Sequence, residues 1–386
     1  MRLLCFVDNL GAGGAQRQLC SLAVLLQREG LDVSMLTYHA GGFFAEALDR
    51  AGIPRLVAGG SGGLKRVLAV RRAIASARPD VVLAFLPMPC LYAEIAGAFG
   101  RRWGLIVGER STTPDAGSPR ARFLRQMHRL ADAVVTNSHA NRRLIEQSVP
   151  ALRGRVSTIY NVVDLDRFAA TPLPQRDGPL RVVIAANYRA VKNPAGWVEA
   201  ARIIRERRGP GVVTTDWYGG GAYFDSGKDE RQATQMLVDR YGLRDDVRLH
   251  EACPDIQTRY RAAHVVALPS LFEGLPNTVC EAMACARPAA SSAVSDAALL
   301  IRDGSGGTGV LFDPRDPHDI ATKVLELADL PEDRLRIMGQ RARDRAEELF
   351  APSQVSGAYH RLAAACLGPT RPDPVFWPST DMARPG

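Results

Sequence analysis

Short, continuous apolar runs alternate with helix-length segments along most of this 386-residue chain. Runs that are apolar at nearly every position are typical of parallel strands, because helices cover both faces of a parallel sheet. Their alternation with helical segments therefore favours doubly wound α/β domains. A chain of this length usually forms two domains, since a single hydrophobic core stops growing at roughly 250–300 residues.

The alternation occurs twice, on either side of an interruption. The first set of predicted strands is Leu3–Val7, Asp32–Leu36, Val81–Phe85, Gly104–Val107, Ala133–Thr136 and Val156–Ile159. Residues 171–179 are rich in Pro and polar residues and lack a hydrophobic period, which indicates a linker. The second set of predicted strands is Arg181–Ala185, Val212–Trp217, Val247–Leu249, Val265–Leu268 and Val310–Phe312. We therefore predict one domain over 1–170, a second over 178–350, and a Pro-rich, disordered tail over 369–386.

The composition of the chain indicates where the protein is located and which charge its binding partners carry. Hydrophobic residues make up 46% of the chain and charged residues 23%, as in globular proteins, and no apolar run is long enough to predict a transmembrane helix. Seven scattered cysteines without metal-binding spacing predict reduced thiols and a cytoplasmic location. The net charge of +8 favours anionic partners such as nucleotide phosphates or a membrane surface.

Much of the positive charge lies between residues 101 and 130, which contain seven arginines and two acidic residues. Three arginines share one face of a predicted helix and three apolar residues share another, namely Arg122, Arg125 and Arg129 against Phe123, Met127 and Leu130. Two interpretations stay open. The helix could lie on an anionic membrane, or it could be an ordinary surface helix with solvated arginines. Nucleic acid is not an expected partner, because no aromatic-rich platform accompanies the arginines.

The segment that points most directly to chemistry is Pro-Ser-Leu-Phe-Glu-Gly-Leu-Pro-Asn-Thr-Val-Cys-Glu-Ala-Met, residues 269–283. It follows a predicted strand, and its Gly-Leu-Pro-Asn turn opens a helix. The free N–H groups and the dipole of a helix N-terminus attract an anion. Glu273 can accept hydrogen bonds from sugar hydroxyls, and Glu281 lies about one helical turn beyond Asn277. The segment therefore suits a sugar that carries a phosphate.

This segment resembles the donor-site signature of the retaining glycosyltransferases of family 4, which is roughly Pro-Ser-x-x-Glu-Gly-x-Pro with a second Glu eight positions after the first. The resemblance covers about 1–367 and implies the GT-B fold, in which two doubly wound parallel-sheet domains face a cleft. It implies that a last helix, 352–367, returns to the first domain. It also implies that Glu273 holds the sugar hydroxyls and that Glu281 binds the ribose. The remaining donor-binding residues implied here are Gly274, Leu275, Pro276, Asn277 and Thr278.

Glycine-containing segments elsewhere extend the resemblance. Gly13 and Gly14 follow the first strand, where glycines let the backbone approach a ligand closely. A dinucleotide fingerprint is not met there, because Gln16 occupies the position of its third glycine. The run instead resembles the family's Gly-Gly-Ala-Glu loop beside the donor diphosphate. Gly219 and Asp255 lie in segments that resemble the family's loops near the nucleotide and its base.

The loop after the first strand of the second domain resembles the family's Gly-Arg-Leu-x-x-x-Lys-Gly segment, whose Arg and Lys neutralise the diphosphate. Lys192 matches the family lysine. Asn187 occupies the usual arginine position, so we expect Arg189 to take over that role. Many relatives carry a His after the fifth strand of the first domain, and this chain lacks it. We expect Glu109 or Arg110 to face the acceptor side of the cleft instead.

These observations together predict a retaining glycosyltransferase that moves a sugar from a nucleotide-diphospho-sugar to a glycan or lipid-linked acceptor. Polysaccharide or glycoconjugate synthesis is the expected context, in the cytoplasm or at the inner face of the cell membrane. No cofactor or metal is expected, because the seven histidines lack metal-ligand spacing. A sugar-nucleotide epimerase on the same fold and a non-catalytic nucleotide-sugar-binding protein remain alternatives.

Overall fold

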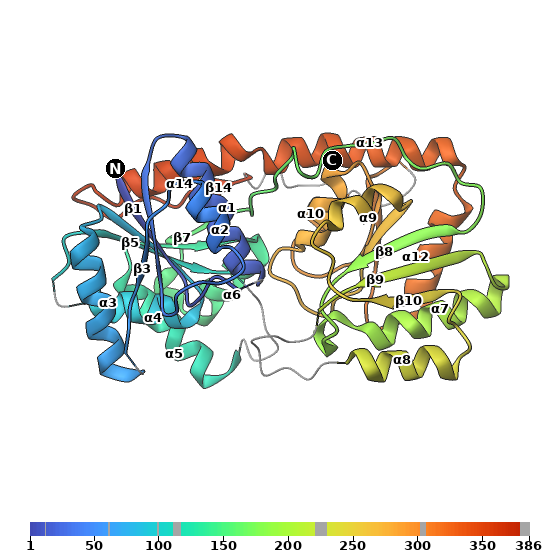
Figure 1. Ribbon diagram of the computed structural model, residues 1–386, viewed down its shortest axis with the longest axis horizontal. Helices are drawn as coiled ribbons and strands as arrows, with labels where there is room; N and C mark the ends of the chain where they lie inside the picture. The colour runs from blue at the N-terminus through green and yellow to red at the C-terminus, as the bar shows by residue number, and fades with distance from the viewer. Residues whose placement is uncertain are drawn as a thin grey trace. The chain divides into compact units, whose positions relative to one another are not determined.

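The computed structural model describes residues 1–11, 13–60, 62–98, 100–110, 117–220, 230–301 and 306–378. They form two compact units. Among the described residues, unit 1 contains Met1–Val162 and 352–378, and unit 2 contains Val163–Ala351. Each unit is a parallel sheet with helices on both faces, which confirms the predicted fold class (Figure 1).

The sheet of unit 1 has the strand order β14-β7-β6-β5-β4-β1-β2-β3, and its paired strands are all parallel. The strands are β1 (Arg2–Phe6), β2 (Asp32–Thr37), β3 (Arg55–Val57), β4 (Val81–Phe85), β5 (Gly104–Glu109), β6 (Ala133–Thr136), β7 (Val156–Ile159) and β14 (Phe376–Trp377). The helices are α1 (Gly14–Arg28), α2 (Ala45–Arg50), α3 (Gly63–Ala77), α4 (Pro87–Gly97), α5 (Pro119–Met127), α6 (His139–Ser148) and α14 (Pro352–Ala365). Two short 3₁₀ turns, η2 (His128–Leu130) and η3 (Pro150–Leu152), follow α5 and α6.

Alternate side chains of each strand enter different cores of unit 1, because successive residues of a strand point to opposite faces of the sheet. Leu3 and Cys5 of β1 pack with residues of α1 and α14. Leu4 and Phe6 pack with residues of α3, α4 and α6 on the other face. Both faces are therefore buried, which explains why the strand sequences are apolar throughout. Among the described residues, no helix is long and apolar enough to cross a membrane.

Strand β14 lies within the segment predicted to be a disordered tail, so that prediction is corrected for Phe376–Trp377. The two residues pair in parallel with Thr158 and Ile159 of β7. The guanidinium of Arg142 lies 4.8 Å from the centroid of the Phe376 ring, and Trp377 packs against the core. The contacts of these two half-buried aromatic side chains thus offset the surrounding prolines. The last residues of the tail, 379–386, lie outside the described part of the chain.

The sheet of unit 2 has the order β10-β9-β8-β11-β12-β13, again with parallel pairs. Its strands are β8 (Leu180–Ala185), β9 (Val213–Tyr218), β10 (Val247–His250), β11 (Val265–Leu268), β12 (Ala289–Ser292) and β13 (Gly309–Phe312). Its helices are α7 (Pro194–Arg208), α8 (Arg231–Arg240), α9 (Ile256–Ala262), α10 (Asn277–Ala284), α11 (Ala297–Leu300), α12 (Pro317–Asp329) and α13 (Glu332–Phe350), with the 3₁₀ turn η4 (Ala190–Lys192). Helices α7 and α8 lie on one side of the sheet and α9 and α10 on the other (Figure 1).

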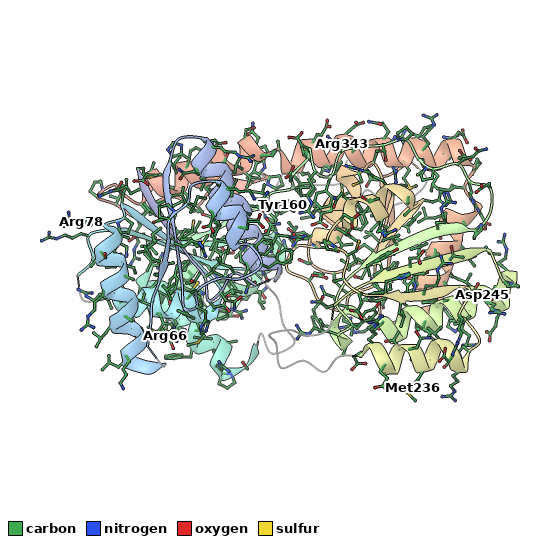
Figure 2. All side chains as sticks on the ribbon, in the orientation of Figure 1. Arg66, Arg78, Tyr160, Met236, Asp245 and Arg343 are labelled. Carbon is green, nitrogen blue, oxygen red and sulfur yellow. The ribbon has the colours of Figure 1, made fainter. Side chains whose placement is uncertain are left out.

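Residues 163–170 belong to unit 2, although the sequence suggested a boundary at the 171–179 linker. Arginines of two helices hold the backbone of this segment. The Arg261 guanidinium donates to the carbonyl oxygen of Arg167 at 2.8 Å. Arg343 of α13, labelled in Figure 2, donates to the carbonyl oxygen of Phe168 at 3.2 Å. These long-range contacts have no local sequence pattern, so the boundary could not be located from composition.

Candidate functional site

The strand order of unit 2 changes direction between β8 and β11. Strands β8, β9 and β10 proceed toward one edge of the sheet, and β11, β12 and β13 proceed toward the other. In open parallel sheets, ligands bind outside the carboxyl ends of the strands at such a switch point. The loops that leave β8 and β11 there are residues 186–193 and 269–276. Both segments were predicted from the sequence to bind the donor.

An ion pair joins these two loops. The Nζ atom of Lys192, in η4, lies 2.5 Å from Oε1 of Glu273. The backbone N–H of Leu271 also donates to the carbonyl oxygen of Val191 at 2.8 Å. The side chains of Lys192 and Glu273 are 25% and 11% exposed, so both remain accessible at one end. An ammonium group has three donors and a carboxylate has several acceptor positions. Each group can therefore bind a ligand while the pair stays intact.

Helix α10 begins at Asn277, directly after this loop. Thr278 in its first turn donates from Oγ1 to the carbonyl oxygen of Ala185 at 2.8 Å, which fixes the helix N-terminus beside the end of β8. Glu281 is buried on α10, and the Tyr260 hydroxyl donates to its Oε2 at 3.3 Å. The Ser295 hydroxyl donates to the carbonyl oxygen of Gly274. The loop 269–276 and the start of α10 are therefore held on both sides by side chains of unit 2.

The other predicted residues of the donor segment lie at the same switch point with different exposure. Leu275 and Pro276 are buried, which gives them a packing role at the start of α10. Asn277 is half-buried in the first turn of the helix. Arg189 is half-buried in the loop after β8, three residues before Lys192. The structure thus brings both predicted cations to the edge of the sheet that carries Glu273.

Gly219 follows β9 and marks a close approach between two backbones. A Cβ atom at this position would lie 2.2 Å from the carbonyl oxygen of Ala186, in the loop that follows β8. Only glycine fits so near another backbone. The N–H of Gly219 also donates to the carbonyl oxygen of His250 at 3.2 Å. Gly219 therefore brings the ends of three neighbouring strands together.

Sequence reasoning missed a stacked pair at the ends of β9 and β10. The rings of Tyr218 and His250 have centroids 4.6 Å apart and an interplanar angle of 15°. Asp216 contacts the Nε2 atom of His250 at 2.7 Å and accepts two hydrogen bonds from Arg248 at 2.9 Å. The Arg259 guanidinium lies 5.6 Å from the centroid of the Tyr218 ring. The sequence signal for this cluster was the spacing of its residues within each strand, Asp216 with Tyr218 and Arg248 with His250. Residues two apart in a strand point to the same face of the sheet.

Asp255 lies close to this pair in sequence, in the loop between β10 and α9. Its side chain is exposed and accepts a hydrogen bond from Cys253 Sγ at 3.0 Å. This hydrogen bond holds the pKa of Asp255 below its usual value. The loop thus presents an exposed carboxylate shortly after the end of β10.

In unit 1, Gly13 and Gly14 form the N-terminus of α1 and are exposed. The carbonyl oxygen of Gly13 accepts from Arg17 N–H, which begins the helix. Gln16 replaces the family glutamate and donates from Nε2 to Oδ1 of Asp8 at 3.1 Å. The exposed N–H groups of this helix start can receive an anionic group.

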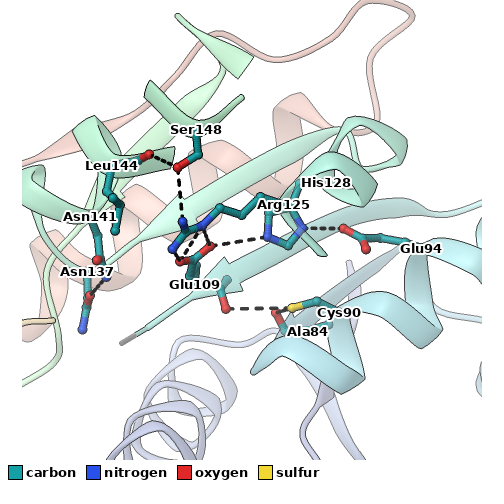
Figure 3. Close-up of polar contacts among 11 residues, drawn as sticks. Ala84, Cys90, Glu94, Glu109, Arg125, His128, Asn137, Asn141, Leu144 and Ser148 are labelled. Carbon is teal, nitrogen blue, oxygen red and sulfur yellow. Dashed lines mark hydrogen bonds and ion pairs between the residues drawn. The ribbon is translucent and has the colours of Figure 1, made fainter. Parts of the chain in front are cut away.

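The structure corrects the expectation that Glu109 or Arg110 is presented to an acceptor. Arg110 is buried, where it donates to the hydroxyl of Tyr359 at 3.0 Å and to the amide oxygen of Asn161. Glu109 accepts two hydrogen bonds of 3.0 Å from Nε of Arg125, as Figure 3 shows. Both side chains therefore form these hydrogen bonds within unit 1. These contacts were not visible in the sequence, because the partners Tyr359, Asn161 and Arg125 lie 16 to 249 residues away.

One of the two open interpretations of this helix placed Arg125 on a membrane together with Arg122 and Arg129, and it is corrected for Arg125. Arg125 is only 4% exposed, because its guanidinium binds Glu109 and lies 3.2 Å from the hydroxyl of Ser148. Arg122 and Arg129 are exposed. The burial of a charged group requires a charged, hydrogen-bonded partner, and Glu109 supplies it.

His128 and Glu94 complete a buried charged network around Glu109 (Figure 3). The Nδ1 atom of His128 lies 2.7 Å from Glu94, and its Nε2 atom lies 3.7 Å from Glu109. Burial alone would lower the pKa of His128, but these two carboxylates outweigh it and raise the pKa to about 9. Burial also raises the pKa of Glu109, but hydrogen bonds from His128 and Arg125 leave it below its usual value.

Two family profiles match consecutive parts of this chain. The profile described as Glycosyltransferase Family 4 matches residues 12–167, and the one described as Glycosyl transferases group 1 matches residues 169–345. Together they cover most of both units. The chain belongs to the family 4 glycosyltransferases.

The relatives of this family 4 glycosyltransferase agree with its fold. D-inositol 3-phosphate glycosyltransferase of Thermobifida fusca is 29% identical over 246 residues, 59% of this chain and 54% of that protein. The chain spans about half the length of the curated relatives it matches. The crystal structure of Anabaena Alr3699/HepE with UDP and glucose has a TM-score of 0.78 and 19% identity, covering 93% of this chain and 98% of that one. Sucrose-phosphate synthase of Thermosynechococcus elongatus has a TM-score of 0.75 and 19% identity, covering 94% and 99%.

Within the described residues of the family 4 chain, no group of three His, Cys, Asp or Glu side chains is arranged to hold a metal ion. The groups near the switch point of unit 2 that can bind an anion include cationic side chains and the N–H groups of a helix start. The arrangement can neutralise phosphates through Lys192, Arg189 and the start of α10, and it can bind hydroxyls through Glu273.

Proposed function

We propose that this family 4 glycosyltransferase binds a nucleotide-diphospho-sugar in unit 2 and transfers the sugar with retention to a glycan or lipid-linked acceptor. The observation that carries the proposal is the Lys192–Glu273 ion pair at the sheet's switch point. It places a phosphate-binding cation and a hydroxyl-binding carboxylate within one hydrogen bond of each other. A sugar bonded to a diphosphate requires such a pair of neighbouring groups.

In this proposal, the diphosphate of the donor lies near Arg189, Lys192 and the N-terminus of α10. Glu273 then accepts hydrogen bonds from the sugar hydroxyls, and Glu281 binds the ribose. The burial of Glu281 supports this assignment, because a buried carboxylate on α10 with one tyrosine partner retains further acceptor positions. The exposed helix start at Gly13 and Gly14 in unit 1 is suited to a further anionic group.

The base lies, we propose, near Tyr218, His250 and Asp255. Neighbouring strands are about 4.8 Å apart, so the end of β10 is roughly 10 Å from the end of β8. That distance suits a base whose diphosphate is bound at β8. An aromatic face accepts any base by stacking. UDP is proposed as the first nucleotide to test, because Anabaena Alr3699/HepE has been solved with UDP and glucose.

The chemistry proposed for the site is a same-face displacement. The bond between the anomeric carbon and the phosphate oxygen breaks as the acceptor oxygen bonds to that carbon. The acceptor proton moves to the leaving phosphate oxygen, so no protein side chain acts as a nucleophile. Arg189 and Lys192 stabilise the negative charge that develops on the diphosphate, and preorganised cations are effective at this task.

A glycosyltransferase is distinguished from a sugar-nucleotide epimerase by the products. The purified protein would be incubated with UDP-glucose, and with other nucleotide sugars, alone and with glycan or lipid acceptor extracts. A glycosylated acceptor with equimolar nucleoside diphosphate, absent from Glu273→Ala, supports transfer. An altered nucleotide sugar formed without acceptor would support the epimerase. Tight donor binding without any product would support a binding protein and contradict the proposal.

A further inference from the structure

Helix α5 and the turn η2 expose apolar side chains and bury a charged one. Phe123 is 58% exposed and Leu130 is 37% exposed, whereas Arg125 is 4% exposed. A surface helix normally buries its apolar stripe and leaves its arginines in water. Leu124 and Met127 of α5 are half-buried, so the helix turns part of its apolar surface inward and leaves Phe123 and Leu130 in water.

The charged network described above fixes this orientation. Arg125 binds Glu109 of β5, and His128 binds Glu94 of α4 (Figure 3). Separating either pair would leave an uncompensated charge in the interior, which is strongly unfavourable. Helix α5 therefore cannot turn Phe123 inward without breaking both pairs. The exposure of Phe123 and Leu130 is a consequence of specific contacts and not of loose packing.

Exposed cations surround these apolar side chains. Arg120, Arg122 and Arg129 of the same segment are exposed. Arg101 donates to the carbonyl oxygen of Leu130 at 2.8 Å, which brings exposed Arg102 near the same turn. The nearby acids are already paired, since Glu109 binds Arg125 and Asp132 binds Arg101. The surface therefore combines protruding apolar groups with a local excess of positive charge.

We propose that this surface, made of Arg120, Arg122, Phe123, Arg129 and Leu130, docks unit 1 onto an anionic lipid membrane. Aromatic and aliphatic side chains can enter the boundary between headgroups and acyl chains, while arginines bind the anionic headgroups. A second copy of the chain fits this surface poorly. A symmetric interface would bring identical arginines together, and like charges oppose such contacts.

Vesicle co-sedimentation tests the proposal directly. The full chain would be mixed with vesicles of phosphatidylcholine alone, or with about a third phosphatidylglycerol, at low and physiological salt. We expect at least tenfold tighter binding to the anionic vesicles, weakened by salt. Phe123→Ser with Leu130→Ser, and separately Arg122→Gln with Arg129→Gln, should each reduce that binding about tenfold or more.

Matched controls are available on unit 2. Met236 on α8 is 66% exposed and points outward in Figure 2, so Met236→Ser removes a comparable apolar group elsewhere. Arg334 and Arg336 of α13 are exposed, so their replacement by Gln removes the same charge as the paired arginine variant. All variants are exposed substitutions, and an unchanged Tm would show that folding is intact. The controls should bind vesicles like the wild-type chain.

Several results would overturn the proposal. Equal binding to neutral and anionic vesicles would exclude the electrostatic part, and unchanged binding of the Phe123 and Leu130 variant would exclude the apolar part. A dimer in analytical ultracentrifugation that Phe123→Ser dissociates would identify the surface as a protein interface. Donor binding in unit 2 is measured without vesicles, so either outcome leaves the proposed transferase activity to be judged separately.

Discussion

The Nζ atom of Lys192 lies 2.5 Å from Oε1 of Glu273, and this ion pair joins the loops that follow β8 and β11. The two residues are 81 positions apart in the chain. They meet because their strands are neighbours at the switch point of the sheet, where adjacent carboxyl ends form a common edge. The pair links a group suited to phosphate with a group suited to sugar hydroxyls.

Replacing either partner should abolish transfer with little effect on folding. We expect Lys192→Ala and Glu273→Gln to lower kcat/KM by roughly 100- to 1,000-fold, since each removes an electrostatic contact to the reacting sugar phosphate. Because both side chains are partly exposed, Tm should change by only a few degrees. The matched control is Lys323→Ala, which breaks the Lys323–Glu326 ion pair on α12. Activity in that variant should equal the wild type.

Gly219→Ala should disturb the nucleotide site through the backbone alone. The added methyl group would lie 2.2 Å from the carbonyl oxygen of Ala186, so one of the two loops must move. Overpacking of this kind costs about 1–3 kcal/mol. We expect a lower Tm and weaker nucleotide binding by isothermal titration calorimetry. Gly178→Ala is the control, because a Cβ atom at Gly178 would meet nothing within 4 Å. Unchanged binding in Gly219→Ala would show that the loop ends tolerate displacement.

The aromatic pair should contribute to binding of the base more than of the sugar. We expect Tyr218→Ala and His250→Ala to weaken binding of a nucleoside diphosphate by about 1–3 kcal/mol, the usual contribution of one stacking contact. The affinity ratio between a nucleotide and its nucleotide sugar should stay constant. Phe43→Ala, which removes an exposed aromatic group from unit 1, serves as the control. If both variants bind UDP, GDP and ADP as the wild type does, the base lies elsewhere.

The buried network predicts that unit 1 loses stability in mildly alkaline solution. The pKa of His128 is about 9 in the folded chain and roughly 6.5 in an unfolded one. Its contribution is therefore complete below pH 6.5 and is lost as the pH rises through 9, because the folded state binds more protons in that interval. The loss would be on the order of 3 kcal/mol.

Comparison with His128→Gln isolates this contribution. Tm of the wild type should fall more steeply between pH 7 and 9.5 than Tm of the variant, measured by differential scanning calorimetry. Other groups that titrate in the same interval are common to both proteins and cancel in the difference. Parallel Tm curves for the two proteins would show that His128 is not held protonated by Glu94 and Glu109.

The sequence was sufficient for the fold class and for the loop and helix that follow β11, because both depend on local patterns. Continuous apolar strands predicted the two sheets, and the spacing of Glu273 and Glu281 predicted the loop and helix that follow β11. Strand β12 was missed, since its sequence Ala-Ala-Ser-Ser lacks the branched and aromatic residues that favour strands. Its place in the sheet is defined by pairing with β11 on one side and β13 on the other.

The orientation of α5 could not be predicted from its own periodicity. Helical spacing separated Phe123 from Arg125 on two faces and left open which face is buried. The buried charges of Glu94 and Glu109 require Arg125 and His128 toward the core. Those acids lie on α4 and β5, at distances of 16 to 34 residues along the chain. Tertiary electrostatics therefore outweighed the amphipathic pattern. The stacking of Tyr218 on His250 was missed for the same reason, since it depends on the register of two strands.

The most direct test of the central claim is nucleotide-sugar binding measured on the wild type, Lys192→Ala and Lys323→Ala. Differential scanning fluorimetry with uridine, guanosine and adenosine diphosphates and their sugars would identify the base, because a bound ligand raises Tm by mass action. Calorimetric titration of the preferred nucleotide sugar would then compare the three proteins. Binding that is weakened at least tenfold in Lys192→Ala and unchanged in Lys323→Ala is the predicted result. Equal affinity in all three proteins would contradict the placement of the donor at the Lys192–Glu273 pair.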